Sequence, residues 1–275
     1  MSSVEVLCAT MDQVDCLVKY KEMNIQSDVI FANQADCFKL EIREINNNTV
    51  KMITTPYRGV GNNRNMALLF STAKIVLFAD DDLVYSDEYV KYVEKAYKEL
   101  PDADFIIFNR DNSDGIKRRN TNKIKRVRWW NFLAYGTCRF SARISSLKRA
   151  NIMFNQLFGG GCPYSCGEDN LFLKDVLAKG LKVYTYPYTL FDIRPSISTW
   201  FEGYTSKFFY DHGAWMQATF PYLKYLLIYY YYITFRRRNM GKNLRLFKLM
   251  KAGIVGYKKI ITYDQWVSKD ESLNL

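Results

Sequence analysis

The sequence predicts an α/β fold, built as a mainly parallel sheet with helices on both faces. In the first third of the chain, short apolar runs alternate with stretches whose apolar residues have helical spacing. This alternation is typical of a parallel sheet, because the crossover between two parallel strands usually contains a helix. The hydrophobic fraction is 48% of 275 residues, which allows a sizeable core and argues against disorder.

The expected elements follow from their residue patterns. Apolar and β-branched runs predict strands at residues 4–9, 28–32, 50–53, 75–78, 104–108, 140–144 and 181–184. Helices are predicted at residues 12–20, 62–72 and 169–178, and one more is expected to be capped by Ser86 and to carry Tyr89, Val93 and Tyr97 on one side. Residues 111–128 are polar and contain seven Lys and Arg, so we expect a mobile surface loop there.

The composition changes after residue 220, which divides the chain into a main domain, residues 1–220, and a helical tail, residues 221–275. Residues 221–260 contain ten Lys and Arg and no Asp or Glu, together with an aromatic and aliphatic run at 222–235. A helix with one apolar face and basic residues elsewhere lies in a membrane interface without crossing it. The alternatives are a tail that packs on the main domain and a tail that mediates a dimer.

The overall charge is basic, since 39 Lys and Arg against 28 Asp and Glu give a net charge of +11. This favours an anionic partner, whether phosphate, nucleic acid or a membrane surface. The first residues show no signal peptide, and the longest apolar run, 220–235, is shorter than the ~20 residues of a spanning helix. The six cysteines have no zinc-site spacing, which indicates free, buried thiols in a reducing compartment. We expect a cytoplasmic protein, or one peripheral to the inner face of the cell membrane.

Three consecutive aspartates, Asp80, Asp81 and Asp82, follow the predicted strand at 75–78. Ligands of open α/β sheets bind beyond the carboxyl ends of the strands, where this triplet falls. Adjacent like charges are unfavourable unless a cation neutralises them, and Mg²⁺ or Mn²⁺ prefers oxygen ligands and leaves room for substrate phosphates. The triplet therefore predicts a metal site. The alternative is a solvated acidic turn that caps the next helix.

Two further segments have residues suited to ligand chemistry. Gly59, Gly61 and the polar run at 62–65 precede a helix whose N-terminal amides attract phosphate, and Arg64 adds a charge-assisted contact. Asp36 follows the second strand and has the acceptor oxygens to bind the edge of a base. Each of these features, taken alone, is also common in ordinary turns and loops.

The segment Gly167-Glu168-Asp169 follows the glycine-rich turn at 159–161 and begins a helix. A carboxylate held at the edge of a loop can take a proton from a hydroxyl group, but acidic residues are also favoured at helix N-termini for electrostatic reasons. His212 is the only histidine of the chain. It is either a packed residue or a ligand of phosphate or metal.

These pieces, in this order, resemble a family 2 glycosyltransferase of the GT-A fold, of the bacterial branch that builds surface glycans. The resemblance is carried by residues 58–67 (RGVGNNRNMA), 76–82 (VLFADDD) and 167–172 (GEDNLF), and it extends from the N-terminus to about residue 215. It implies an inverting, metal-dependent transfer from a nucleotide-sugar, with UDP as the expected nucleotide and Mn²⁺ or Mg²⁺ as the cofactor. The acceptor would be a glycan or a lipid-linked glycan.

The resemblance also implies residue roles on the donor side. Thr10 and Asp36 would hold the uracil, although Asn33 is an alternative to Asp36 because the second strand ends in Asn33-Gln34-Ala35-Asp36. Arg64 would approach the donor from its helix. Asp80 and Asp82 match the family's DxD pattern.

Within that pattern Asp82 would be the direct metal ligand, while Asp80 would face the ribose or sugar and Asp81 would lie on the donor side. Asp169, the second acid of the family's ED pattern, would be the catalytic base. His212 would face the diphosphate, and it is also the weakest candidate metal ligand.

Two other functions are alternatives to glycosyl transfer. A sugar nucleotidyltransferase would carry a glycine-rich basic loop directly after the first strand, where this chain reads Cys8-Ala9-Thr10-Met11-Asp12. A nucleic-acid-binding protein would fit the net charge, but the basic residues are concentrated at 111–128 and in the tail rather than among the aromatics of a sheet face. Neither is favoured, and no nucleic acid partner is expected.

Overall fold

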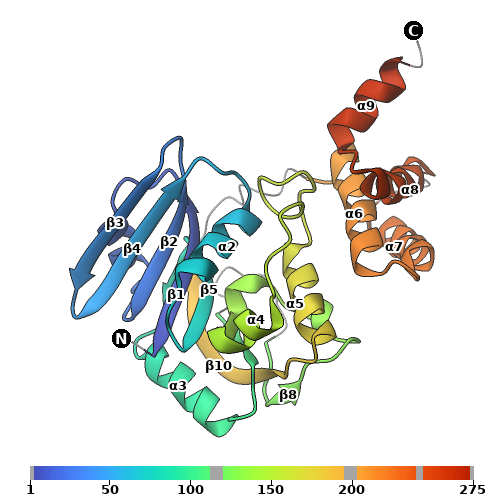
Figure 1. Cartoon of the computed structure of the whole chain (residues 1–275). Coiled ribbons are helices and arrows are strands. Elements are labelled where there is room, and N and C mark those ends of the chain that lie inside the picture. The colour runs from blue at the N-terminus through green and yellow to red at the C-terminus, as the bar shows by residue number, and fades with distance from the viewer. Residues whose placement is uncertain (1–2, 112–119, 195–202, 240–243, 273–275) are drawn as a thin grey trace. The chain divides into compact units, whose positions relative to one another are not determined.

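The computed structural model describes residues 3–111, 120–194, 203–239 and 244–272 (Figure 1). The chain divides into two compact units. The sheet unit contains residues 1–154 and 172–197, and the helical unit contains residues 155–171 and 198–275. Each unit is described by itself.

The sheet unit is organised around one mixed sheet with the strand order β3-β4-β2-β1-β5-β9-β7-β10-β6, and β8 pairs with β10. The strands are β1 (Val4–Met11), β2 (Asp28–Gln34), β3 (Lys39–Ile45), β4 (Asn48–Thr55), β5 (Ile75–Asp80), β6 (Leu83–Tyr85), β7 (Phe105–Arg110), β8 (Lys125–Arg126), β9 (Phe140–Arg143) and β10 (Val183–Ile193).

The predicted α/β class is confirmed by the pairing of these strands. β4, β2, β1 and β5 are parallel neighbours, and so are β7 and β10. The remaining strands, β3, β6, β8 and β9, pair antiparallel. Two of these strands, β3 and β6, were not predicted from the sequence. β3 is an edge strand with exposed apolar side chains, and β6 has only three residues.

Helices cover both faces of the sheet (Figure 1). On one face, α1 (Cys16–Glu22) and α3 (Tyr89–Glu99) share a buried core with β1 and β5. On the other lie α2 (Val60–Phe70), α4 (Ile144–Ala150) and α5 (Glu168–Ala178). There the rings of Phe154 and Phe172 stack with centroids 3.9 Å apart, and both meet Phe78 of β5 edge-on.

Two predicted helix starts are corrected. α1 begins at Cys16 rather than at residue 12, because the Asp15 carboxylate accepts a hydrogen bond from the Leu17 amide and caps the helix there. Ser86 does not cap α3. Its hydroxyl donates to the Leu190 carbonyl at 3.1 Å, and α3 begins three residues later after Glu88, which has left-handed backbone angles.

The loop predicted at 111–128 is partly ordered by the sheet. Residues 112–119 lie outside the described residues. Beyond them, the Asn120 side chain donates to the Arg110 carbonyl at 2.7 Å, and the Thr121 amide donates to Asn109 at 2.8 Å. Strand β8 then pairs with β10. The second half of the segment is therefore held by backbone and side-chain hydrogen bonds rather than being a mobile loop.

The helical unit contains residues 155–171 together with α6 (Ser206–Thr219), α7 (Lys224–Asn239), α8 (Leu244–Lys259) and α9 (Tyr263–Ser272). Helices α6 and α8 approach so closely at Gly213 that a Cβ added there would lie 2.0 Å from the Met250 carbonyl oxygen. This compact unit therefore includes α6, which precedes the boundary predicted at residue 220. No helix within the described residues has both the length and the apolar character needed to cross a membrane.

Candidate active site

The carboxyl ends of β1 and β5 bring Thr10 and the acidic triplet together. The two strands are parallel neighbours, with Ala9 opposite Asp80. The Thr10 hydroxyl donates to Asp81 Oδ2 at 2.5 Å. Residues that are 71 positions apart in sequence thus meet at the sheet edge where α/β proteins bind ligands.

Arg64 of α2 forms an ion pair with this acidic group. Its Nη2 donates to Asp80 Oδ1 at 2.8 Å, and its guanidinium lies 5.3 Å from the centre of the Phe154 ring. The Arg64 side chain is only 4% exposed, whereas that of Asp80 is 45% exposed. A buried guanidinium needs a charged partner. In the structure Arg64 is therefore paired with Asp80, and its predicted approach to the donor stays a prediction.

Two amide side chains hold the start of α2 at the same edge. Neither was predicted as a site residue. Asn63 Nδ2 donates to the carbonyls of Thr10 and Ala32, both at 3.0 Å. Gln34 Oε1 accepts from the amide of Gly59, whose φ of 105° suits glycine. The available signal was the polar run at 62–65, in which Asn63, Arg64 and Asn65 are all buried.

The two candidate base contacts, Asn33 and Asp36, have different surroundings. Asn33 is buried and its amide is used internally. It accepts from the Gln13 amide at 3.0 Å and donates to the Gln13 carbonyl at 2.9 Å and to Thr54 at 3.1 Å. Asp36 is exposed and pairs with Arg58. Asp36 therefore has the carboxylate that a ligand can reach.

Asp82 lies in the turn between β5 and β6, and its carbonyl accepts from the Arg194 amide at 2.9 Å. Burial, followed by the charges of all three aspartates, raises the pKa of the nearby Cys8 thiol. No cluster of three or more His, Cys, Asp or Glu that would enclose a metal occurs among the residues that the structure describes. Carboxylate oxygens at one edge still fit a hard cation such as Mg²⁺ or Mn²⁺, which commonly takes one or two carboxylates and completes its shell with substrate phosphates.

The segment that precedes Asp169 belongs to the helical unit. α5 begins at Glu168, and the Leu171 amide donates to the Gly167 carbonyl at 3.0 Å. Gly167 has a φ of +100°, and a Cβ added to it would lie 2.0 Å from Cδ1 of Trp215. Glycine is therefore required there both by backbone angle and by space.

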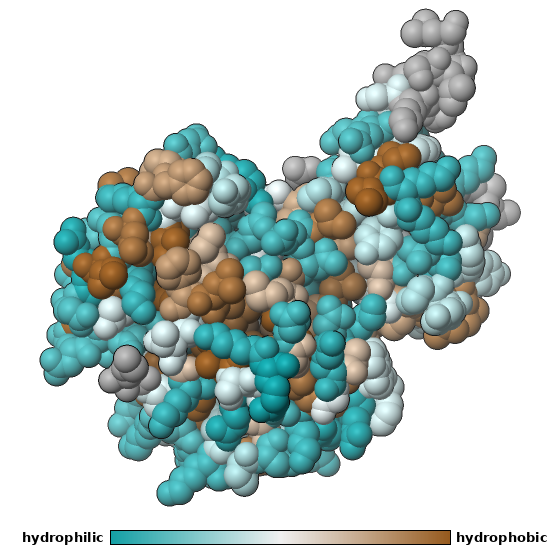
Figure 2. All heavy atoms as spheres, viewed as in Figure 1, coloured by the Kyte–Doolittle hydropathy of each residue, from teal (hydrophilic) through white to brown (hydrophobic). Residues whose placement is uncertain are grey.

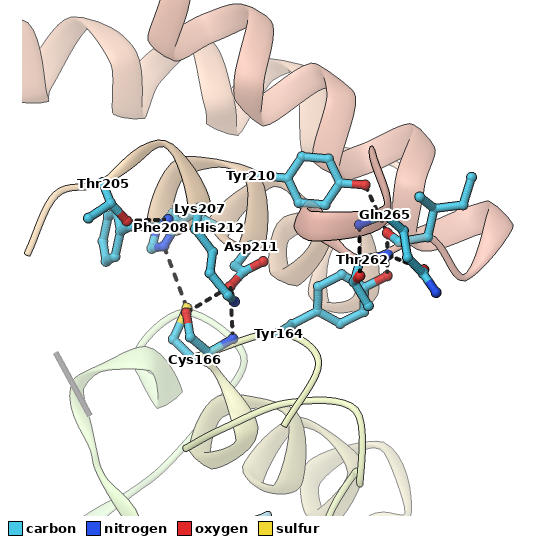
Figure 3. A network of polar contacts seen from close by, with 12 residues as sticks. Tyr164, Cys166, Thr205, Lys207, Phe208, Tyr210, Asp211, His212, Thr262 and Gln265 are labelled. Atoms are coloured by element: carbon cyan, nitrogen blue, oxygen red, sulfur yellow. Dashed lines mark hydrogen bonds and ion pairs between the residues drawn. The ribbon is translucent and has the colours of Figure 1, made fainter. Parts of the chain in front are cut away.

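A buried carboxylate on α6 holds the same segment (Figure 3). Asp211 is fully buried, and its Oδ2 accepts from the Ser165 amide at 3.0 Å and from the Ser165 hydroxyl at 2.8 Å. Lys207, one helical turn earlier, completes the network with an ion pair of 2.5 Å to the same oxygen. The sequence analysis named neither residue, since a lone Lys-x-x-x-Asp spacing on a helix gives no functional signal.

His212 lies among aromatic rings. Its ring centre is 4.6 Å from that of Tyr231, 4.9 Å from Trp215 and 5.3 Å from Phe208, and its Nδ1 is 4.0 Å from Cys166 Sγ. Burial lowers the pKa of His212 to about 4, so the ring is neutral at pH 7. His212 is thus a packed residue in this structure, and its predicted position opposite the diphosphate stays a prediction.

The structure thus gathers Thr10, Arg64, Asp80 and Asp81 in the sheet unit, while Asp169 and His212 belong to the helical unit. All six cysteines have free thiols, as predicted, although only Cys8 and Cys16 are buried.

Comparison with known proteins bears on both fold and family. No curated protein matches the sequence at a significant level. Among solved structures, residues 1–349 of S. aureus TarS in complex with UDP-GlcNAc resemble the chain with a TM-score of 0.60 and 14% identity, over 94% of this chain and 72% of that one. The complex of the same residues with UDP gives a TM-score of 0.58 and 15% identity, over 93% and 71%.

At such low identity the likeness shows the fold, which is of the GT-A type. The family follows from the sequence itself. The model of "Glycosyl transferase family 2" matches residues 32–180, a range that includes the acidic triplet and Asp169. Because this match covers more than half of the chain, the protein belongs to glycosyl transferase family 2 and is a glycosyltransferase.

Proposed function

We propose that this enzyme is an inverting, metal-dependent glycosyltransferase that moves a sugar from a UDP-sugar to a glycan or lipid-linked acceptor of cell-surface polymer synthesis. The observation that carries the proposal is the meeting of Thr10, Arg64 and the acidic triplet at the carboxyl edge of the sheet. The UDP-GlcNAc and UDP complexes of TarS, which shares the fold, support UDP as the nucleotide.

In this proposal Thr10 and Asp36 bind the uracil. The exposed Asp36 carboxylate suits the uracil N–H, and the Thr10 hydroxyl oxygen keeps acceptor capacity while it donates to Asp81. Asn33 supports the base site by holding the turn at Gln13. Asp80 faces the ribose or the sugar, with its carboxylate oriented by Arg64.

Asp82 would hold Mn²⁺ or Mg²⁺, with Asp80 as the second carboxylate of the DxD pattern. When bound, the cation offsets the negative charge that grows on the departing diphosphate. Holding the cation by few protein ligands leaves coordination positions for the phosphates.

The transfer itself is a direct displacement. The acceptor hydroxyl oxygen forms a bond to the anomeric carbon as the bond from that carbon to the diphosphate oxygen breaks, and the electron pair stays with UDP. Asp169 takes the proton of the hydroxyl. Because attack comes from the face opposite the leaving group, an α-linked donor gives a β-glycoside.

Calorimetry of UDP with Mn²⁺ tests the donor site. Asp82→Ala should remove most of the Mn²⁺-dependent affinity, whereas Asp87→Ala, an exposed carboxylate in the turn before α3, should bind like the parent protein. Equal affinity of the Asp82 variant and the parent would sink the metal assignment. A thermal-shift series with UDP-, GDP- and dTDP-sugars tests the nucleotide, because a ligand of the native state raises the melting temperature.

We also propose that the helical unit binds an anionic membrane surface peripherally. Along α7 and the turn before it, one face is exposed and apolar or aromatic: Tyr222, Tyr225, Leu226, Tyr229 and Tyr230. The opposite face is buried through Ile228 and Tyr232. We call the exposed set the α7 stripe. Tyrosine suits the boundary between lipid and water, since one end of its ring is apolar and the other polar.

Charge complementarity identifies the partner. The exposed face of α8 presents the basic residues Arg245, Lys248, Lys251, Lys258 and Lys259. Residues 221–260 contain no acid that would oppose them. Each basic residue near an anionic leaflet adds about 1 kcal/mol. Aromatic and basic surfaces on consecutive helices fit an anionic lipid surface better than a neutral one.

Vesicle co-sedimentation tests this. Truncation at residue 220 would leave α6 without α8, so point changes are preferable. The parent protein should pellet with anionic but not with neutral vesicles, and the triple variant Leu226→Ser, Tyr229→Ser and Tyr230→Ser should stay in solution. The control carries Leu40→Ser and Ile42→Ser, which alter exposed apolar residues of β3, where apolar side chains reach the surface of the sheet unit (Figure 2). If the triple variant pellets like the parent, or the parent ignores anionic vesicles at low salt, the membrane assignment fails.

A further inference from the structure

We propose that Asp211 is a positioning residue of the transfer reaction, which acts by fixing the segment that presents Asp169. The proposal rests on the proposed role of Asp169 as the base. Its evidence lies wholly within the helical unit, where Asp211 binds Ser165, four positions before Asp169 (Figure 3).

The side chain of Asp211 is fully buried, whereas its partner Lys207 keeps 29% of its own side chain exposed. A buried ion pair is a poor source of stability, since desolvation of both charges offsets much of their attraction, and apolar replacements often stabilise a protein as well or better. What a buried pair supplies is direction, because a fixed carboxylate accepts hydrogen bonds from defined places.

Asp211 fixes both the backbone and the side chain of Ser165. One of its carboxylate oxygens accepts a hydrogen bond from the Ser165 amide and another from the Ser165 hydroxyl. Hydrogen bonds to a charged acceptor are roughly twice as strong as neutral ones. Ser165 cannot rotate without breaking at least one of them.

Neighbouring contacts transmit this restraint along the segment. Before Ser165, the Tyr164 hydroxyl donates to the Ile261 carbonyl at 3.3 Å. After it, Gly167 lies against Trp215 with no room for a side chain. From Glu168 onward the chain is helical, so residues 164–167 fix the point from which the first turn of α5 starts. Asp169 lies in that first turn.

A general base must lie within hydrogen-bond reach of its proton. A displacement of about 1 Å can lower turnover by roughly 10²-fold even when no reacting group is changed. The carboxylate of Asp211 need not touch the substrate to matter for the rate, because a shift of Ser165 would shift Asp169.

The test begins with Asp211→Ala and Asp211→Asn. Alanine removes the acceptor, so turnover should fall by roughly 10–10²-fold, while the affinity for UDP with Mn²⁺ stays unchanged. Asparagine keeps one oxygen for Ser165 and loses only the charge, so it should restore most of the lost turnover. Asp264→Ala, an exposed carboxylate in the same unit, is the matched control and should behave like the parent. A purely structural part for Asp211 would lower the melting temperature without this split between turnover and donor affinity.

A double-mutant cycle with Asp169→Asn decides the pathway of the effect. If Asp211 acts through Asp169, Asp211→Ala should cost little further turnover once Asp169 is already Asn, because the group it positions is gone. Multiplicative losses would overturn the proposal. Near-normal turnover of Asp169→Asn alone would instead refute the proposed base, and the positioning role with it.

Ser165→Ala keeps the ion pair and removes a single hydrogen bond, which covers the case in which Asp211→Ala does not fold. Its melting temperature should fall only by the loss of one hydrogen bond, and its turnover should fall severalfold while the affinity for UDP stays unchanged. Unchanged turnover in this folded variant would overturn the proposal.

Discussion

The donor edge of the sheet unit and the Asp169 segment of the helical unit are built by different means. At the donor edge, neighbouring strands place Thr10 and Asp81 side by side, and short polar contacts from α2 reinforce a position that the sheet already sets. The Asp169 segment has no such strand framework. Two residues of α6 hold it instead. Asp211 accepts a hydrogen bond from the Ser165 amide, and Trp215 packs against Gly167.

The two regions also differ in where along the chain their supporting residues lie. The donor edge depends on residues inside the range that the family model matches, 32–180, or on β1, which precedes that range. The Asp169 segment depends on Lys207, Asp211 and Trp215, which lie beyond that range. Changes in the helical unit should therefore affect turnover more than donor binding.

The largest effect is expected for Asp169→Asn. The change keeps the shape of the side chain and removes its affinity for a proton, so turnover should fall by ~10²–10⁴-fold, while UDP affinity barely changes. Steady-state kinetics and calorimetry measure the two quantities. Asp175→Asn, on the exposed side of the same helix, should retain full turnover. Loss of UDP affinity in the Asp169 variant would erase the contrast between the two regions.

Gly213→Ala should disturb the helical unit alone. The added Cβ would lie 2.0 Å from the Met250 carbonyl oxygen, so α6 and α8 would have to separate, at a cost of about 1–3 kcal/mol for an overpacked contact. Thermal unfolding should show a lowered transition, and turnover should fall while the variant still binds UDP. Lys248→Ala, exposed on α8, should change neither. Equal losses of UDP binding and turnover would argue that the two regions are not separable.

Asn63→Ala should give the opposite pattern. It leaves the carbonyls of Thr10 and Ala32 without their side-chain donor, and a buried polar group left unsatisfied costs about 1–3 kcal/mol. We expect weaker UDP binding, measured by calorimetry, with the helical unit intact by thermal unfolding. Asn62→Ala is the control, at a half-buried neighbour whose side chain donates to the Arg58 carbonyl rather than to Thr10 or Ala32. Unchanged UDP affinity would show that the start of α2 does not shape the donor edge.

The smallest effect concerns His212. Its pKa is lowered from 6.5 to about 4 by burial, so the unfolded chain binds a proton between these values while the folded protein does not. Stability should therefore fall as the pH drops from about 6.5 toward 4, by roughly 2 kcal/mol between pH 7 and pH 5. As the only histidine, His212 gives a single imidazole signal whose NMR titration should stay flat down to pH 5. A midpoint near 6.5 would contradict its burial among the aromatic rings, and His212→Gln should lose this part of the pH dependence.

The sequence predicted the framework of the fold well and several details poorly. Long apolar runs, such as those at 75–78 and 104–108, became buried strands because burial on both faces requires continuous apolar residues. β3 and the ordered half of 111–128 were missed, since an edge strand and a hydrogen-bonded loop have too little burial to produce such a run. Helix starts were misplaced where a cap, rather than periodicity, sets the first residue.

The sequence by itself determined the family. The glycine turn, the aspartate triplet and the Gly-Glu-Asp segment occur in one order, and the chemistry of these residue types does not depend on the surrounding fold. Only the tertiary structure decided that Arg64 is paired with Asp80, that the amide of Asn33 is hydrogen-bonded internally, and that His212 is buried among aromatic rings. It also revealed Asp211, whose partner Ser165 is 46 positions away. The physical reason is that partner choice and desolvation depend on which distant residues surround a group, and no local spacing encodes them.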